Sequence, residues 1–239
     1  MLTKPTPARR GRPSRPPRPD HFIGIRIHGG QALAEIRREI LKRTPDIAGF
    51  MEEEVKAHVT LGVLRLDTPE KLARCTNEFK RSANTVREVG LFPSEGFRIA
   101  FRTFDMFDQR VLFLRPSDPC IAKLKELRSY LFDTAMSEFN ADTRQDYKPH
   151  LTLAKRTRWV SKRREMPASG LPKVPPTMPE DTTAYGDVVV DVDAVVASVE
   201  LVQMRGEKEA DGYYKIVASE PLCGQVREDR QSDDAWMTG

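Results

Sequence analysis

Hydrophobic and polar positions along the chain follow two different periods, which predict an alternation of strands and helices. Three segments, 31–43, 69 to about 89, and 118–139, place apolar residues at helical spacing. The second segment begins with Thr68 and Pro69, a capping residue followed by the residue type that suits a first helical position. Runs rich in β-branched and aromatic residues predict strands at 21–27, 57–66, 96–104, 110–116, 148–155, 195–205 and 212–222.

Short connections join several of these strands directly. The strands at 96–104 and 110–116 flank the sequence DMFDQ, which predicts a hairpin, and GEKEADG separates the last two strands. Hairpins pair their strands in antiparallel fashion, and helices separate the remaining strands along the chain. The pattern therefore predicts an α+β fold that is rich in antiparallel sheet.

The composition divides the chain of 239 residues into one folded domain and two tails. Residues 21–222 carry the strand and helix patterns, and their length suits a single domain. Residues 1–20 are basic and rich in proline, and residues 223–239 are polar, so both are predicted to be disordered tails. Within the domain, residues 155–185 combine basic residues with a proline-rich stretch, which predicts a long loop.

The net charge of +4 comes from the amino-terminal tail. Residues 1–20 carry a net charge of +5, so the rest of the chain has a net charge of −1. Basic segments bind phosphate, so this tail and the 155–185 loop could contact RNA, but the charge does not indicate a nucleic-acid-binding domain body.

Cysteine usage and hydropathy give the expected location. Three widely spaced cysteines without a CxxC pair favour a reducing, intracellular compartment, either the cytoplasm or the nucleus. No apolar run approaches the roughly 18 residues that a membrane span needs. We therefore expect no membrane contact, and we expect a monomer.

The sequence His-x-Thr-Leu occurs twice, each time at the end of a strand–helix–strand unit. His58 and Thr60 lie in AHVTLGV, and His150 and Thr152 lie in PHLTLAK, 92 residues further along. Side chains alternate between the two faces of a strand, so each histidine shares a face with its threonine. An internal duplication would produce this arrangement, and two such units facing each other would line one cleft.

Strict alternation makes further predictions for the first motif strand. It places Gly62 on the same face as His58 and Thr60. It places three apolar residues on the opposite, buried face: Val59, Leu61 and Val63.

Two histidines and two threonines around one cleft suit phosphoryl chemistry. Neutral imidazole accepts a proton from an attacking hydroxyl, and imidazolium donates one to the leaving oxygen. Histidine titrates near neutral pH, so a pair can share these two roles. The threonine hydroxyls can donate hydrogen bonds to the non-bridging phosphate oxygens, and the scheme uses no metal or other cofactor.

Two other interpretations compete with this one. A single His-x-Thr in a strand is more often a packing feature than a catalytic one, but the second copy makes that interpretation less favourable. The other two histidines, His21 and His28, flank the first strand and are interpreted as structural. A zinc site needs three or four ligands, and the sequence has no HExxH motif and no Cys/His cluster.

The paired motifs resemble those of the two-histidine (2H) phosphoesterase superfamily. Within it, the chain is similar to the central domain of A-kinase anchoring proteins of the nuclear-localising type and to their 2′,5′-phosphodiesterase relatives. The segments that carry the resemblance are HFIGIRI, AHVTLGVLRL, GFRIAFRTF, YKPHLTLAK and ADGYYKIVASEPL, which span residues 21 to about 222. The resemblance implies a bilobal fold, with two antiparallel-rich sheets and flanking helices around a pseudo-twofold central cleft.

The resemblance also implies a metal-independent phosphodiesterase that acts on 2′,5′-linked oligoadenylate or a related small nucleotide phosphodiester. Carried over to this chain, His58 and His150 are the catalytic general acid and base, in an order that stays open, and Thr60 and Thr152 bind the phosphate. Two alternatives also stay open: a non-catalytic nucleotide- or RNA-binding adaptor, and an RNA-end-processing nuclease or ligase of the same superfamily.

The chain departs from the family pattern in two places. The carboxy-terminal sequence REDRQSDDAWMTG has no amphipathic helix, so the anchoring of a kinase subunit is not indicated. The 155–185 loop is longer and richer in proline than the resemblance leads us to expect, and it follows the second motif directly.

A substrate base could stack on an aromatic side chain beside the cleft. For each candidate, an ordinary core or surface position is the competing interpretation. The candidates are Tyr214, Phe104 and Tyr185, together with Tyr213 and Trp159.

Overall fold

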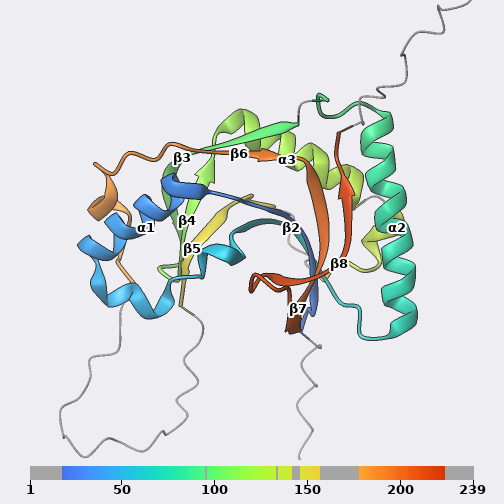
Figure 1. Ribbon diagram of the computed structural model, residues 1–239, viewed down its shortest axis with the longest axis horizontal. Coiled ribbons are helices and arrows are strands. Elements are labelled where there is room, and N and C mark those ends of the chain that lie inside the picture. The colour runs from blue at the N-terminus through green and yellow to red at the C-terminus, as the bar shows by residue number, and fades with distance from the viewer. Residues whose placement is uncertain (1–17, 95, 133, 142–145, 157–177, 224–239) are drawn as a thin grey trace, which may run out of the picture.

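The computed structural model describes residues 18–94, 96–132, 134–141, 146–156 and 178–223 (Figure 1). The longer helices are α1 (Gly30–Arg43), α2 (Pro69–Glu88) and α3 (Asp118–Leu131). The strands are β1 (His21–Arg26), β2 (His58–Leu64), β3 (Phe97–Phe107), β4 (Val111–Pro116), β5 (Leu151–Lys155), β6 (Val192–Val196), β7 (Ser198–Lys208) and β8 (Tyr214–Pro221). Short helical segments are η1 (Pro45–Phe50), η2 (Glu54–Lys56), α4 (Thr134–Ser137) and η3 (Thr183–Tyr185).

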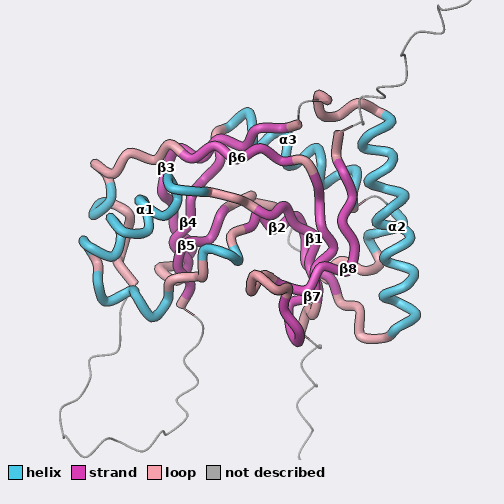
Figure 2. The backbone as a smooth tube through the Cα atoms, viewed as in Figure 1, coloured by secondary structure: helices cyan, strands magenta, loops and turns pink. Residues whose placement is uncertain are grey.

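The eight strands of the described residues form one antiparallel sheet in the order β6-β3-β4-β5-β2-β1-β7-β8. Figure 2 shows β3, β4 and β5 in one part of the sheet and β1, β7 and β8 in another, with β2 between them. The predicted α+β class and antiparallel pairing are confirmed. The expected two sheets are continuous, because β2 and β5 pair with each other at Val59 and Leu151.

The strand order is symmetric about the junction between β2 and β5. β1 pairs with β2 and with β7, in the same way that β4 pairs with β5 and with β3. Each half contains a strand, a helix and a second strand that carries one His-x-Thr motif: β1-α1-β2 and β4-α3-β5. The duplication suggested by the sequence is thus present in the topology.

The helices bury their apolar sides in one continuous core, which also contains the buried face of the two motif strands at Val59 and Leu151. α2 packs against β7, β8 and α3, and Figure 1 shows α1 on the side of β4 and β5, away from α2. The predicted start of α2 is confirmed, because the Thr68 Oγ1 accepts a hydrogen bond from the Lys71 amide at 3.2 Å and Pro69 opens the first turn.

Each motif strand contains a β-bulge directly after its threonine. In β2, Ile23 and Gly24 of β1 face Gly62 and Thr60, so Leu61 is the extra residue. In β5, Leu112 and Phe113 of β4 face Ala154 and Thr152, so Leu153 is the extra residue. A bulge shifts the alternation of side chains by one position beyond it. The two bulges lie at equivalent positions, so they extend the symmetry of the two motifs.

The bulge in β2 corrects two predictions made from strict alternation. Gly62 is on the buried face, where an added Cβ would lie 2.3 Å from the Phe132 ring that follows α3. Val63 is on the face of His58 and packs in a small cluster with Phe22, Val202 and Tyr213. Strict alternation failed here because one extra residue reverses every face beyond it.

Two element boundaries also differ from the sequence predictions. The helix expected over 118–139 ends at Leu131, and a separate short helix, α4, follows. The strand expected over 195–205 is the end of β6 and most of β7, which pair with different partners, β3 and β1. The hairpin expected around DMFDQ is confirmed, with Asp108 and Gln109 at positive φ values of 48° and 51°, as a tight hairpin turn requires.

Residues 1–17, 157–177 and 224–239 lie outside the described residues, and with them most of the predicted tails and of the 155–185 loop. In the part of the chain that the structure describes, no helix is long and apolar enough to span a bilayer.

Candidate active site

The strand register brings the two motifs together on one face of the sheet. Val59 and Leu151 face each other across antiparallel strands. Antiparallel geometry then sets His58 opposite Thr152 and Thr60 opposite His150, all four on the face opposite Val59 and Leu151. His58 and His150 are thereby diagonal neighbours, and residues in that relation lie roughly 7–8 Å apart, with their Cβ atoms somewhat closer. That spacing leaves room for one phosphoryl group between the two imidazoles.

His58 lies in an aromatic surround. Its ring stacks on Phe22, with centroids 4.6 Å apart and an angle of 25° between the planes. The Tyr214 ring meets it edge-on at 5.8 Å. Phe22 reaches this position because residue 24 is glycine, and a Cβ there would lie 2.9 Å from the Phe22 ring. The imidazole is therefore held between two rings and is only partly accessible.

His150 has a similar surround from the other half of the sheet. Phe107 meets its ring edge-on at 5.0 Å, and Phe113 contacts it at 5.1 Å. Phe113 of β4 faces Thr152 of β5. In the other half of the sheet, the equivalent residue, which faces Thr60, is Gly24 of β1. Phenylalanine rings thus enclose both histidines, but they come from different positions in the two halves.

The same backbone contact orients both imidazoles. The Nδ1 of His58 lies 2.6 Å from the carbonyl oxygen of Lys56, and the Nδ1 of His150 lies 2.7 Å from that of Lys148. A carbonyl oxygen can only accept a hydrogen bond, so Nδ1 carries the proton in each ring. In the neutral ring the lone pair is then on Nε2, which is the nitrogen able to exchange a proton with a substrate.

Burial lowers the pKa of His58 from 6.5 to about 4, because the enclosed ring is poorly solvated when charged. The hydrogen bond to Lys56 opposes this shift, and the positive charges of His150 and Lys155 add to it. The effect of His150 on His58 agrees with the register in placing the two rings near each other. His58 is therefore neutral at neutral pH and is suited to accept a proton.

The lowered pKa predicts a pH-dependent stability. Between pH 6.5 and about pH 4 the unfolded chain protonates His58 and the folded chain does not. We expect the free energy of unfolding to fall by roughly 1–3 kcal/mol as the pH drops through this window. His58→Gln should remove this part of the pH dependence, as urea unfolding at several pH values would show.

The exposed His28, in the connection between β1 and α1, provides the matched control for that experiment. His28→Gln should leave the pH dependence as in the wild type. An unchanged slope in His58→Gln would contradict the assignment of a buried, neutral imidazole at this position.

The aromatic residues that the sequence suggested as stacking partners for a base lie in different surroundings. Tyr214 is beside His58, and the Lys208 ammonium lies 4.0 Å above its ring. Tyr185 is 1% exposed and Phe104 packs against it at 5.3 Å, so these two rings contact each other. Both belong to the main core, and that placement leaves no open face of Tyr185 for a base.

The two further stacking candidates are Tyr213 and Trp159. Tyr213 is fully buried, with the Arg26 guanidinium 4.1 Å above its ring. Trp159 lies outside the described residues. Tyr214 is therefore the one candidate that the described residues place next to a motif histidine.

Sequence reasoning missed several residues around the motif histidines. Phe22, Phe107 and Phe113 enclose the histidines, and Lys155 lies beyond the bulge of β5, close enough to lower the pKa of His58. Their residue types are ordinary for strands, so only the strand register and the two bulges could have identified them.

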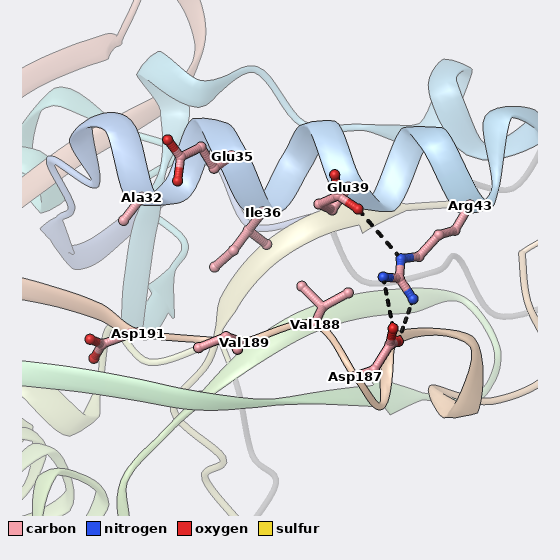
Figure 3. A pocket seen from close by; sticks show the side chains of 9 residues that line it. All are labelled: Ala32, Glu35, Ile36, Glu39, Arg43, Asp187, Val188, Val189 and Asp191. Atoms are coloured by element: carbon pink, nitrogen blue, oxygen red, sulfur yellow. Dashed lines mark hydrogen bonds and ion pairs between the residues drawn. The ribbon is translucent and has the colours of Figure 1, made fainter.

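A groove of about 410 Å³ lies elsewhere, between α1 and residues 187–191 (Figure 3). Glu35, Glu39, Asp187 and Asp191 line it, and the Arg43 Nη2 binds the Asp187 carboxylate at 3.1 Å. No motif residue lines this groove. A rim with four carboxylates and one paired arginine repels phosphate, so the groove does not suit a phosphodiester.

Among the described residues, no three side chains of histidine, cysteine, aspartate or glutamate come close enough together to hold a metal ion. We base the chemistry of this site on the paired histidines and threonines.

Comparisons with known proteins identify the family of this chain. Residues 19–222 match the family model described as the AKAP7 2'5' RNA ligase-like domain. A search of curated protein sequences gave no significant match.

Solved structures with similar folds include E. coli LigT complexed with 3'-AMP, which is 19% identical with a TM-score of 0.52, over 85% of this chain and 98% of that chain. A phosphoesterase crystal structure is 17% identical with a TM-score of 0.50, over 86% of this chain and 99% of that chain. Usb1 of Kluyveromyces marxianus is 11% identical with a TM-score of 0.47, over 84% of this chain and 96% of that chain. The chain belongs to the AKAP7 2'5' RNA ligase-like domain family, within the 2H phosphoesterase superfamily, whose chemistry is that of RNA and nucleotide phosphodiesters.

Proposed function

We propose that this protein is a metal-independent phosphodiesterase that acts on 2′,5′-linked oligoadenylate or a related small nucleotide phosphodiester. The observation that carries the proposal is the face shared by His58, Thr60, His150 and Thr152 on two paired strands. The matched family is named for a 2'5' RNA ligase-like domain, and a protein of similar fold, LigT, has been crystallised with 3'-AMP. Both names point to a ribose-linked phosphate as substrate.

The two histidines have different surroundings, which supports different roles. The lowered pKa of His58 keeps its Nε2 unprotonated, so His58 accepts the proton from the attacking ribose hydroxyl or water. As the oxygen–phosphorus bond forms, the bond to the leaving oxygen breaks. His150 completes the proton balance in its imidazolium form: its Nε2–H donates the proton that the leaving oxygen takes up, and the ring is left neutral with its remaining proton on Nδ1.

Thr60 and Thr152 lie between the two histidines on the same face. Their hydroxyls donate hydrogen bonds to the two non-bridging oxygens of the phosphate, where negative charge increases in the transition state. The two Lys carbonyls that hold Nδ1 fix the ring orientations before substrate binds. The residues thus provide acid, base and oxyanion stabilisation without a rearrangement of the strands.

A substrate panel tests the proposal. We expect turnover of 2′,5′-oligoadenylate or of a 2′,3′-cyclic nucleotide in the presence of a chelator, detected as released nucleotide by chromatography. Loss of activity with chelator would contradict the metal-independent reaction. Tight AMP binding without turnover of any substrate would favour the adaptor instead, and preferential cleavage of longer RNA would favour an RNA-end-processing enzyme.

A further inference from the structure

The two motif strands are joined by very few backbone contacts. Within the described residues, the register between β2 and β5 consists of the single pair Val59 and Leu151. Further along β2, the next residue pair on this side is Leu64 with Asn140, where the Val63 carbonyl accepts a hydrogen bond from the Ala141 amide at 2.8 Å. Between these two points, β2 carries Thr60 and the bulge, and no further ladder pair with β5 is formed by the residues that the structure describes.

Two side chains fill this interval of the ladder. The Tyr147 hydroxyl donates a hydrogen bond to the carbonyl oxygen of Thr60 at 3.0 Å. The Arg128 Nε, from α3, donates one to the carbonyl oxygen of Leu61 at 2.9 Å. The Arg128 guanidinium also lies over the Tyr147 ring, 5.0 Å from its centroid, and over the Phe132 ring at 5.4 Å. The two donors are therefore packed against each other and act on adjacent peptide groups.

Tyr147 also lies next to the residue that orients His150. The Lys148 carbonyl, one residue further along, accepts the hydrogen bond from the Nδ1 of His150. A continuous path therefore runs from the Thr60 carbonyl through Tyr147 and Lys148 to the His150 ring. In the other half of the site, the residue equivalent to Tyr147 is Val55, which packs in the apolar cluster around Phe22. Among the described residues, the hydrogen bond from Tyr147 to Thr60 anchors the His150 half to the opposite motif, and the His58 half has an apolar residue at the equivalent position.

We propose that Tyr147, supported by Arg128, is a positioning residue for the reaction: its hydroxyl ties the segment that orients His150 to the backbone of Thr60. The inference rests on the proposed function. This inference extends the proposed function by naming the group that holds the two halves of the site in register. Proton transfer requires the donor and acceptor to be aligned to a fraction of an ångström, so a loosened segment lowers the rate of the chemical step more than it weakens substrate binding.

The variant that tests this is Tyr147→Phe, which removes the hydroxyl and keeps the ring under Arg128. We expect kcat to fall by roughly 10- to 100-fold with KM changed by less than about threefold. Tyr185→Phe is the matched control, because the hydroxyl of this buried tyrosine likewise donates one hydrogen bond, to the Thr44 Oγ1 at 3.0 Å, away from the motifs. It should lower the melting temperature to a similar extent and leave kcat unchanged.

A readout that does not need turnover separates this inference from the proposed function. Long-range ¹H–¹⁵N spectra report which ring nitrogen of a histidine carries the proton. At a pH at which the His150 ring is neutral, we expect the wild type and Tyr185→Phe to show His150 protonated on Nδ1, and Tyr147→Phe to show exchange between the two tautomers. If Tyr147→Phe retains the wild-type tautomer and the wild-type kcat, Tyr147 is merely structural and the inference fails.

Should the wild type turn over none of the substrates, the proposed function fails and the spectra alone decide the role of Tyr147.

Arg128→Lys gives a second check, because lysine keeps the charge but lacks the planar group and the Nε donor. The double variant with Tyr147→Phe should lower kcat by less than the product of the two single fold-changes, since both residues act on the same stretch of β2. Additive effects would show that Arg128 acts independently of Tyr147.

Discussion

Replacing either motif histidine will remove nearly all turnover. His58→Gln and His150→Gln should each lower kcat by about 10²–10⁴-fold, the usual contribution of a general acid or base, while KM changes little. Glutamine fills a similar volume but cannot exchange a proton at neutral pH. The measurement is steady-state hydrolysis of the best substrate of the panel.

The acid limb of the pH–rate profile distinguishes the two roles. If His58 is the base, the wild-type kcat/KM will stay high well below pH 6.5 and fall as His58 takes up a proton near pH 4. His28→Gln, at an exposed histidine outside the motifs, is the control and should keep wild-type activity. Wild-type rates in His58→Gln or in His150→Gln would refute the two-histidine mechanism, provided that circular dichroism shows a folded protein.

Removing the threonine hydroxyls will have the second-largest effect. Thr60→Val and Thr152→Val should each lower kcat by about 10²-fold, because each removes one donor to a phosphate oxygen that gains charge in the transition state. Valine keeps the branched shape and strand preference of threonine, so the loss is that of the hydroxyl. The double variant should be close to the histidine variants in activity.

Serine provides a test of this interpretation within the same positions. Thr60→Ser and Thr152→Ser keep the hydroxyl and should recover most of the activity lost in the valine variants. Thr103→Val, at an exposed position on β3, is the matched control and should have no effect on kcat. If the valine variants bind inorganic phosphate and turn over substrate as well as the wild type, the threonines have no part in phosphate binding.

The near-symmetry of the two halves explains how an ordinary sheet can hold this chemistry. The bulges after Thr60 and Thr152 keep the two residues that follow on the buried face, and they bring Val63 and Lys155 to the face of the histidines. The halves differ in what surrounds each imidazole: Phe22 above Gly24 for His58, and Phe113 with Phe107 for His150. This difference gives two chemically identical side chains distinct environments, as a general base and a general acid require.

Sequence alone determined the residue types and much of the local structure. The repeated His-x-Thr-Leu, the helical spacing of α1 to α3 and the capping of α2 by Thr68 are encoded locally, within a few residues of one another. Local patterns also indicated the α+β class, since hairpins depend on short turns such as the one at Asp108 and Gln109.

Only the tertiary structure decided how these parts meet. Val59 and Leu151, which pair across β2 and β5, are 92 positions apart in sequence, and the hydrogen bond from Tyr147 to Thr60 spans 87 positions. The pairings at the two bulges are also non-local: Gly24 and Thr60 are 36 positions apart, and Phe113 and Thr152 are 39 apart. Strand register depends on side chains from several elements at once, and one extra residue reverses the faces of all that follow, so periodicity within one strand cannot reveal it. The sequence named the four reactive side chains, and long-range strand pairing placed them on one face with distinct surroundings.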